Sequence, residues 1–310
     1  MLHFGTGGVP LTAKKRDTLS GIDRIKELKL DSMEMEFVQG VKMSDESAKL
    51  VKKKAEENNV GLTIHGPYYI NLATDDEVKL KNSYRHILSS IKVGTFAGAI
   101  SATFHPAFVQ KLSQEEVYSK VRDTLIYLST EKKKNGYTTR ISPELTGKES
   151  QFGRLEDLVR LCKEIPGLGL CYDFAHNYAR SIGNNNTREE VKKSLELIKK
   201  ELGQSFLDDM HIHMSNIEYS DKGERNHIPF LEKIGDYEKN GISEVIGNDE
   251  FFKKYFKEFY EGNKKKWSDR FDWKMIIEEL KEYNVGGFVV CESPVLEWDA
   301  ILLKNYYKSL

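Results

Sequence analysis

The stretch Leu168-Gly169-Leu170-Cys171-Tyr172-Asp173-Phe174-Ala175-His176 decides how the whole chain is interpreted. Its apolar first half is typical of a buried strand, and this strand runs directly into a carboxylate, with an imidazole three residues later. Ionisable side chains at the end of a buried strand are costly to desolvate unless they have partners. Such a pair is either a structural hydrogen bond or part of a binding site.

The same pattern of an apolar strand running into His or Glu recurs along the chain. It is found at Leu62–His65, Ile100–His105, Thr138–Glu144, Asp209–His213 and Gly286–Glu292. Repetition at so many places argues against a set of unrelated structural pairs. It indicates instead that the ends of the strands gather metal-ligating side chains in one place.

Short apolar strands alternate with segments of helical period through most of the sequence. The strand candidates are Leu2–Gly5, Met33–Val38, Gly61–His65, Ser101–His105, Thr139–Pro143, Leu168–Tyr172, Asp209–His213 and Gly287–Cys291. The helix candidates are Gly21–Lys29, Asp45–Asn58, Asp76–Ala97, Gln114–Asn135, Arg154–Ile165, Arg188–Leu202 and Trp273–Glu282. This order predicts an α/β fold, a (β/α)₈ TIM barrel of parallel strands buried on both faces. We expect one domain over residues 1–310, with a long charged insertion at about 215–272 between the seventh and eighth strands.

Composition excludes several classes of protein. No apolar run is long enough to cross a bilayer, and the N-terminus lacks the features of a signal peptide. The three cysteines have no CxxC spacing, so they indicate neither a disulfide framework nor a thiolate metal site. The net charge of -1 provides no global basic field for nucleic acid, which would have to bind at a local patch. We expect a cytoplasmic protein without a membrane partner.

Barrel enzymes have their active sites at the C-terminal ends of the strands, where this chain concentrates its ionisable residues. The candidates at these positions are His65, His105, Glu144, Asp173, His176, His211, His213 and Glu292. Imidazoles and carboxylates without thiolates suit zinc, manganese or iron. They exceed the ligands that one tetrahedral ion can use, so we expect two or three ions. Such a cluster suits phosphoester hydrolysis, because it lowers the pKa of bound water and neutralises charge on a phosphoryl oxygen.

At these residues the sequence resembles endonuclease IV, the zinc-dependent AP endonucleases of family 2, which have a xylose-isomerase-like TIM barrel. The resemblance covers nearly the whole chain and is that of a divergent member of archaeal type. Its most specific pieces are His65-Gly66-Pro67-Tyr68-Tyr69-Ile70-Asn71-Leu72, Thr103-Phe104-His105-Pro106, Cys171-Tyr172-Asp173-Phe174-Ala175-His176 and Met210-His211-Ile212-His213. The resemblance implies Zn²⁺ as the cofactor, with Mn²⁺ or Fe²⁺ as alternatives, and duplex DNA with an abasic site as the partner. We also expect a monomer.

The resemblance implies roles for the ligands of two zinc ions. His65 and His105 would hold the first, and Glu144 would bridge it to the second. The second site would be completed by Asp173, His211 and Glu292. In the family a metal-bridging hydroxide attacks the phosphodiester 5′ to an abasic nucleotide, so Glu144 is the catalytic candidate.

The third zinc site departs from the family pattern. The family closes this site with an Asp-Arg-His run, whereas this chain has Glu224-Arg225-Asn226-His227. His176 and His227 fit the pattern, but Arg225, two residues before His227, cannot bind a cation. Glu224 either supplies the carboxylate with one extra residue of spacing or is a surface residue paired with Arg225. We predict that Glu224 is a ligand.

Two further residues have two interpretations each. His213 stands where the family usually has Asn, and it points to the same side of an extended segment as His211. We predict that it is a hydrogen-bond partner of a ligand rather than a ligand itself. Tyr68 matches a tyrosine that contacts DNA in the family, and the other interpretation is an aromatic that packs a loop at the rim.

Basic side chains lie near the loops that we expect on the active face. They are Lys14, Lys15, Arg16, Lys42 and Lys264–Lys266. Such residues can meet phosphates while the overall charge stays near zero. The other interpretation is the solvated face of a helix, which is common where Lys and Glu are mixed.

The predicted function is a metal-dependent endonuclease that cleaves DNA 5′ to abasic sites in base excision repair. The alternative is a sugar isomerase or epimerase on the same barrel, because fold alone does not separate the two. An isomerase needs one metal, and His65, His105, His176 and His227 are surplus to it. A non-catalytic DNA- or metal-binding relative is a third possibility, because the third site is altered.

Overall fold

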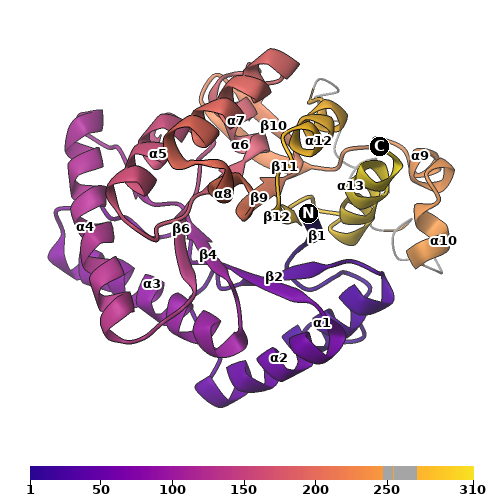
Figure 1. Cartoon of the computed structure of the whole chain (residues 1–310), viewed down its shortest axis with the longest axis horizontal. Helices are drawn as coiled ribbons and strands as arrows, with labels where there is room; N and C mark the ends of the chain where they lie inside the picture. Colours follow the sequence, from indigo (N-terminus) through magenta and orange to yellow (C-terminus); the bar gives the residue numbers. More distant parts are fainter. Residues whose placement is uncertain (247–253, 255–270) are drawn as a thin grey trace.

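The predicted (β/α)₈ barrel is confirmed in the computed structural model, which describes residues 1–246, 254 and 271–310 (Figure 1). One parallel sheet has the strand order β6-β4-β3-β2-β1-β12-β9-β8, and a bridge between Glu144 and Cys171 joins its two ends. The barrel strands are β1 (Leu2–Gly7), β2 (Ser32–Glu36), β3 (Gly61–His65), β4 (Ser101–Phe104), β6 (Arg140–Pro143), β8 (Cys171–Asp173), β9 (Met210–Met214) and β12 (Gly287–Cys291).

Helices surround the barrel, and all of the long ones except the last, α13, follow the order that the sequence predicts (Figure 1). They are α1 (Thr18–Glu27), α2 (Asp45–Asn58), α3 (Glu77–Ala97), α4 (Gln114–Lys134), α5 (Leu155–Glu164), α7 (Arg188–Leu202), α12 (Trp273–Glu282) and α13 (Glu297–Ser309). Shorter elements on the connections are α6 (Phe174–Arg180), α8 (Gln204–Leu207) and the paired strands β5 (Ala107–Phe108) and β7 (Gln151–Phe152). No helix in the described part of the chain is both long and apolar enough to span a membrane.

Alternate residues of the barrel strands point into the barrel, and many of these are polar. On β2, Glu34 is fully buried, and its neighbour Met33 points the other way, toward α1. The Met33 sulfur lies so close to Gly21 of α1 that a Cβ on this glycine would be only 2.7 Å away. On β9, His211 and His213 are likewise fully buried. The strands are therefore apolar toward the helices and polar toward the barrel axis, an alternation that their short length conceals in the sequence.

The connection between β9 and β12 carries a hairpin and two short helices. The hairpin pairs β10 (Asn216–Ser220) with β11 (Gly223–Ile228), and it is followed by α9 (Ile234–Lys239) and α10 (Ile242–Ile246). This is the first part of the insertion predicted at about 215–272. Lys264–Lys266 lie outside the described residues. Figure 1 shows α9 and α10 beside α13, at the edge of the barrel.

Two buried carboxylates at the start of α13 attach loops of the active face to the barrel. Glu297 accepts hydrogen bonds from the backbone N–H groups of Leu11 and Thr12, each at 2.8 Å. Asp299 accepts from the Phe230 N–H at 3.0 Å and from the Tyr237 hydroxyl at 2.6 Å. The loop after β1 and the segment after the hairpin are thus held by one helix.

Candidate metal centre

Glu144, at the carboxyl end of β6, lies at the middle of the candidate site. Its side chain is fully buried, and four histidines from different elements approach it, of which His213 is described below. Oε2 lies 3.2 Å from Nε2 of His65, while Oε1 lies 3.6 Å from Nε2 of His105 and 3.2 Å from Nδ1 of His176. The parallel strands bring these side chains together because all of them end at the same mouth of the barrel.

The first donor group consists of His65, His105 and Glu144, whose ligand atoms all lie within 4.8 Å of one another. Nδ1 of His65 is 2.7 Å from the Gly66 carbonyl oxygen, to which it can donate a proton. Nε2, which faces Glu144, is then the nitrogen that a metal ion would bind in place of a proton. This is the arrangement expected of a histidine ligand, in which a hydrogen bond at one ring nitrogen orients the other.

The second donor group consists of Glu144, Asp173, His213 and Glu292, again within 4.8 Å. Nδ1 of His213 lies 3.3 Å from Oε1 of Glu144 and 3.3 Å from Oε1 of Glu292. Asp173 ends β8 and caps α6, because its Oδ1 accepts the His176 backbone N–H at 2.7 Å. The cap leaves Oδ2 free to face the other members of the group.

The third donor group consists of His176, Glu224 and His227. His176 comes from α6, while Glu224 and His227 come from β11. Two residues three apart on a regular strand would point to opposite faces. The register of the hairpin shifts here, because Glu218 pairs with Asn226 and Tyr219 pairs with Glu224, so Arg225 is an extra, bulged residue. The β-bulge brings Glu224 and His227 to the same side.

Arg225 does not pair with Glu224 in this hairpin. Its guanidinium lies 3.7 Å from Oε1 of Glu218, on the neighbouring strand. Oε2 of Glu224 instead lies 3.6 Å from Nε2 of His176. The geometry therefore gives no support to Glu224 as a surface residue paired with Arg225, and its role as a ligand stays a prediction.

His211 and His213 lie at positions different from those that the sequence suggested. His211 is one layer deeper in the barrel, where its Nε2 is 2.9 Å from Oε2 of Glu34 and its Nδ1 is 3.1 Å from Oγ of Ser101. It does not belong to the group of Glu144, Asp173 and Glu292, and His213 does. The reason is the register of β9 on β8, in which Asp173 pairs with His213 and Cys171 pairs with His211.

The sequence interpretation also missed Glu34 and Glu36 on β2. Both point into the barrel, and a Glu-x-Glu pattern within a short strand was the signal for them. Burial, with Glu34 and Glu292 nearby, raises the pKa of Glu36 to about 8 against the opposing charge of His65. Glu36 is therefore part of the electrostatic surroundings of the first donor group.

The buried acids and imidazoles of the site shift one another's pKa values. Burial disfavours the charged form of His65, but Glu144, Glu36 and Glu292 together raise its pKa to about 10. Burial likewise opposes ionisation of Glu292, yet His213 and His227 lower its pKa to about 2. For Asp173, burial dominates and raises the pKa to about 8. Without metal, the imidazole of His65 thus holds a proton that offsets the charge of the neighbouring carboxylates.

The donor atoms fit divalent metal ions. Within the described ranges, the atoms that are buried without a hydrogen-bond partner include Glu144 Oε1, Asp173 Oδ2, His176 Nε2, His213 Nδ1 and Glu224 Oε2. Buried polar atoms without partners are costly, and several that converge on one place indicate a missing ligand. Nitrogen and oxygen donors of this kind are those of zinc, manganese or iron, and the set does not choose among them.

Tyr68 stands at the mouth of this centre. Its side chain is 53% exposed, and its ring centroid lies 5.1 Å from that of His65 and 6.1 Å from that of His105. A molecule that reaches the first donor group would therefore pass this ring. Lys14, Lys15, Arg16 and Lys42 are exposed on the loops after β1 and β2.

Comparison with known proteins gives one family and several relatives. The model of the family described as "Xylose isomerase-like TIM barrel" matches residues 22–305. An uncharacterized protein of Methanocaldococcus jannaschii is 34% identical over 310 residues, covering 100% of this chain and 98% of the relative. A protein of Aquifex aeolicus named probable endonuclease 4 is 25% identical over 228 residues, covering 72% of this chain and 79% of the relative.

Solved structures of two kinds share the fold. Endonuclease IV from Thermus thermophilus superposes with a TM-score of 0.64 at 15% identity, covering 99% of this chain and 100% of that chain. A D-tagatose 3-epimerase-like protein superposes with a TM-score of 0.65 at 20% identity, covering 99% and 96%. At such identities these structures support the barrel fold and do not separate a nuclease from an epimerase.

Proposed function

The chain belongs to the xylose isomerase-like TIM barrel family, and from its donor groups we propose that it is a metal-dependent endonuclease that cleaves DNA 5′ to abasic sites. The observation that carries the proposal is the sharing of Glu144. Its carboxylate belongs to both the first and the second donor group, and the third group adjoins it through His176. Linked groups of this kind suit two or three ions side by side, an arrangement that can stabilise both the attacking and the leaving oxygen in phosphodiester hydrolysis.

Metal ions held there would supply a nucleophile at neutral pH and neutralise the charge of the phosphate. The chain's own residues would bind the ions and orient the ligand atoms. Glu144 would connect the ions, and the hydrogen bonds of His65 to Gly66 and of Asp173 to α6 would fix the direction of two other ligands. Because Glu144 and His65 are buried, we expect the abasic nucleotide to turn out of the helix to reach them.

DNA is the proposed partner for two reasons. Tyr68 is an exposed aromatic beside the first donor group, where it can stack on a base next to the lesion. Lys14, Lys15, Arg16 and Lys42 provide exposed positive charge around the same mouth, although the chain as a whole carries a formal charge of -1. The Aquifex aeolicus relative named probable endonuclease 4 supports the same class of activity.

The second candidate function is a sugar isomerase or epimerase. It is favoured by the second donor group, since Glu144, Asp173, His213 and Glu292 would suffice to hold one ion. It leaves His65, His105, Glu224 and His227 without a task. Buried ionisable residues are costly to keep, so we prefer the function that uses them.

The test is cleavage of a labelled duplex that contains a single abasic site, with an intact duplex of the same sequence as the control. The protein is purified without added metal, and its zinc, manganese and iron are counted by elemental analysis. We expect at least two ions and a single cut 5′ to the lesion that leaves a 3′-hydroxyl. If the protein holds one ion, leaves the abasic duplex uncut and converts a ketose, the isomerase becomes the better assignment of its function.

A further inference from the structure

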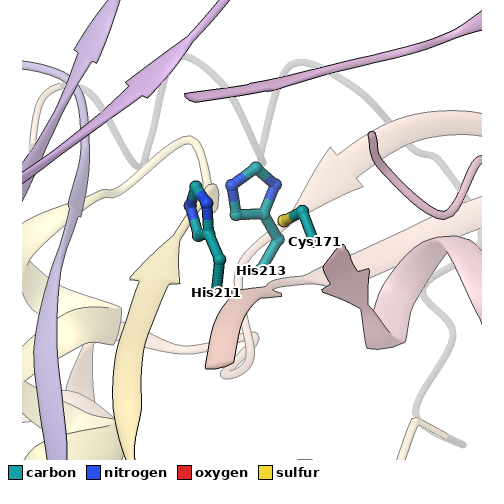
Figure 2. A group of neighbouring side chains, drawn as sticks. All are labelled: Cys171, His211 and His213. Carbon is teal, nitrogen blue, oxygen red and sulfur yellow. The ribbon is translucent and has the colours of Figure 1, made fainter. Parts of the chain in front are cut away.

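Beneath the metal centre lies a layer of buried polar side chains to which the proposed function gives no role. Glu34, His211 and Cys171 are fully buried, and Figure 2 shows Cys171 and His211 on either side of His213. One ligand atom each of Cys171, His211 and His213 lies within 4.8 Å of the others. Burial of this many polar groups in the middle of a barrel is unfavourable unless they are paired.

Glu34 pairs with both histidines of β9. Its Oε1 lies 2.9 Å from Nε2 of His213, and its Oε2 lies 2.9 Å from Nε2 of His211. These are ion-pair separations, at which the buried carboxylate favours a proton on each Nε2. One carboxylate from β2 thus contacts two imidazoles on the opposite side of the barrel.

The two ring nitrogens of His213 face different surroundings. Nε2 faces Glu34 below, whereas Nδ1 faces Glu144 and Glu292 of the second donor group, at 3.3 Å from each. A histidine can offer only a deprotonated nitrogen to a metal, and the hydrogen bond at the other nitrogen decides which one that is. His213 therefore meets an acceptor on the side away from the centre.

We propose that Glu34 is a positioning residue for the metal centre: it holds the Nε2 proton of His213, so that Nδ1 is the atom that His213 presents to a metal. This inference rests on the metal-dependent function proposed above. His211 completes the arrangement, because its Nδ1 lies 3.1 Å from the Ser101 hydroxyl, which is 2.8 Å from the Ser142 hydroxyl. A line of polar contacts thus runs from His213 through Glu34 and His211 to β4 and β6.

Two substitutions separate positioning from packing. Glu34→Met keeps the length of the side chain but accepts no proton, so His213 can protonate Nδ1 instead. In Glu34→Gln the carbonyl oxygen of the new side chain can still accept a hydrogen bond from His213. The NH₂ group of the same side chain can donate to Nε2 of His211. His211 then carries its proton on Nδ1 and donates it to Ser101. Thr63→Val is the matched control, because Thr63 pairs with Glu34 in the β2–β3 register and its buried hydroxyl has no hydrogen-bond partner among the described residues.

The experiment measures zinc affinity by competition with a chelator, and the protonation of the ring nitrogens by ¹⁵N NMR of the zinc-loaded protein. In the wild-type protein we expect His213 to be protonated on Nε2 and metal-bound through Nδ1. Glu34→Met should weaken binding of one zinc about 10- to 100-fold, as loss of a partner of a metal-bound histidine typically does. Glu34→Gln should bind within a few-fold of wild type with the proton of His211 moved, and Thr63→Val should match the wild type.

Three results would overturn the proposal. The first is a zinc-loaded wild type with His213 protonated on Nδ1, which decides the matter even if Glu34→Met does not fold. The second is unchanged zinc affinity in a folded Glu34→Met variant. The third is a thiolate-to-metal absorption band in the cobalt-substituted wild type that is lost in Cys171→Ser, because a metal at Cys171 would occupy the deeper layer itself. Since every readout uses the metal alone, a protein that binds zinc but cuts no DNA would contradict the proposed function and leave this test intact.

Discussion

Oε2 of Glu224 lies 3.6 Å from Nε2 of His176, although one residue belongs to the β10–β11 hairpin and the other to the helix that follows β8. His227, on the same hairpin, has its ring centroid 5.4 Å from that of His176, and its Nδ1 is hydrogen-bonded to the Ser215 hydroxyl. The third donor group thus depends on a hairpin docked against the barrel.

Replacing Glu224 tests this group directly. If Glu224 is a ligand, Glu224→Ala should lower the zinc content by about one ion per chain, because two histidines alone hold the third ion weakly. Elemental analysis measures the change. Glu218→Ala on the same hairpin is the control, since Glu218 pairs with Arg225 outside the donor group. An unchanged zinc content in Glu224→Ala would return this residue to a purely structural role.

The β-bulge at Arg225 gives a second prediction. Deleting Arg225 leaves Glu224 two residues before His227, and residues two apart on a regular strand share a face. We therefore expect the deletion variant to keep its third ion, with a regular hairpin register. Arg225→Ala, which keeps the bulge, should also bind three ions. Loss of one ion in the deletion variant alone would show that the bulge is required and not merely tolerated.

Glu144 provides the sharpest test of activity. Glu144→Gln should reduce cleavage of an abasic duplex to background, because the residue is shared by two donor groups and the amide offers a single oxygen. His105→Ala should do the same. Circular dichroism should show an intact barrel, since the site lies at the mouth. Glu149→Gln, an exposed carboxylate a few residues further on, is the control. Wild-type nicking by either site variant would remove that residue from the mechanism.

Zinc binding should become weaker as the pH falls. In the metal-free protein the pKa of His65 is raised to about 10, so the imidazole is protonated at pH 7 and zinc must displace that proton. Below this pKa the apparent affinity should fall about tenfold per pH unit for each proton displaced. Calorimetry in buffers with different ionisation enthalpies counts the released protons. Binding of zinc between pH 6 and pH 8 without proton release would contradict the predicted decrease of zinc affinity at lower pH.

Tyr68→Ala tests contact with DNA separately from metal binding. Loss of a stacking aromatic typically costs about 1–3 kcal/mol, so we expect about 5- to 150-fold weaker binding of an abasic duplex. The zinc content should not change, because Tyr68 belongs to none of the donor groups. Tyr127→Ala on α4, with 46% of the side chain exposed, is the control. Equal binding by both variants would favour the interpretation of Tyr68 as an aromatic that packs a loop.

Much of the fold could be predicted from local patterns. The bounds of α2, α7, α12 and β12 agree with the sequence prediction, since each has clear periodicity and defined ends. The last helix, α13, was not predicted. Its first turns are buried on several sides and contain Glu297 and Asp299, which are also buried, so it lacks the polar face that marks an amphipathic helix.

The residues of the candidate site could largely be predicted from the sequence, but the layer of the barrel in which each residue lies could not. Residues such as His65, Glu144 and Asp173 could be identified because each ends a strand. The distinction between His211 and His213 could not be drawn, since both point inward and only the pairing of Asp173 with His213 decides which one faces the centre. Register between strands depends on the closed barrel, and no single segment of sequence encodes it.

The division of the donor groups also bears on how chemistry changes during evolution. Glu144, Asp173, His213 and Glu292 come from the barrel strands and the residues that directly follow them, whereas Glu224 and His227 come from a hairpin in a connection. A lineage can gain or lose the hairpin ligands without altering the packing that keeps the barrel folded. A barrel with the strand-end ligands alone and one that also has the hairpin ligands would therefore differ by a few substitutions and one connection.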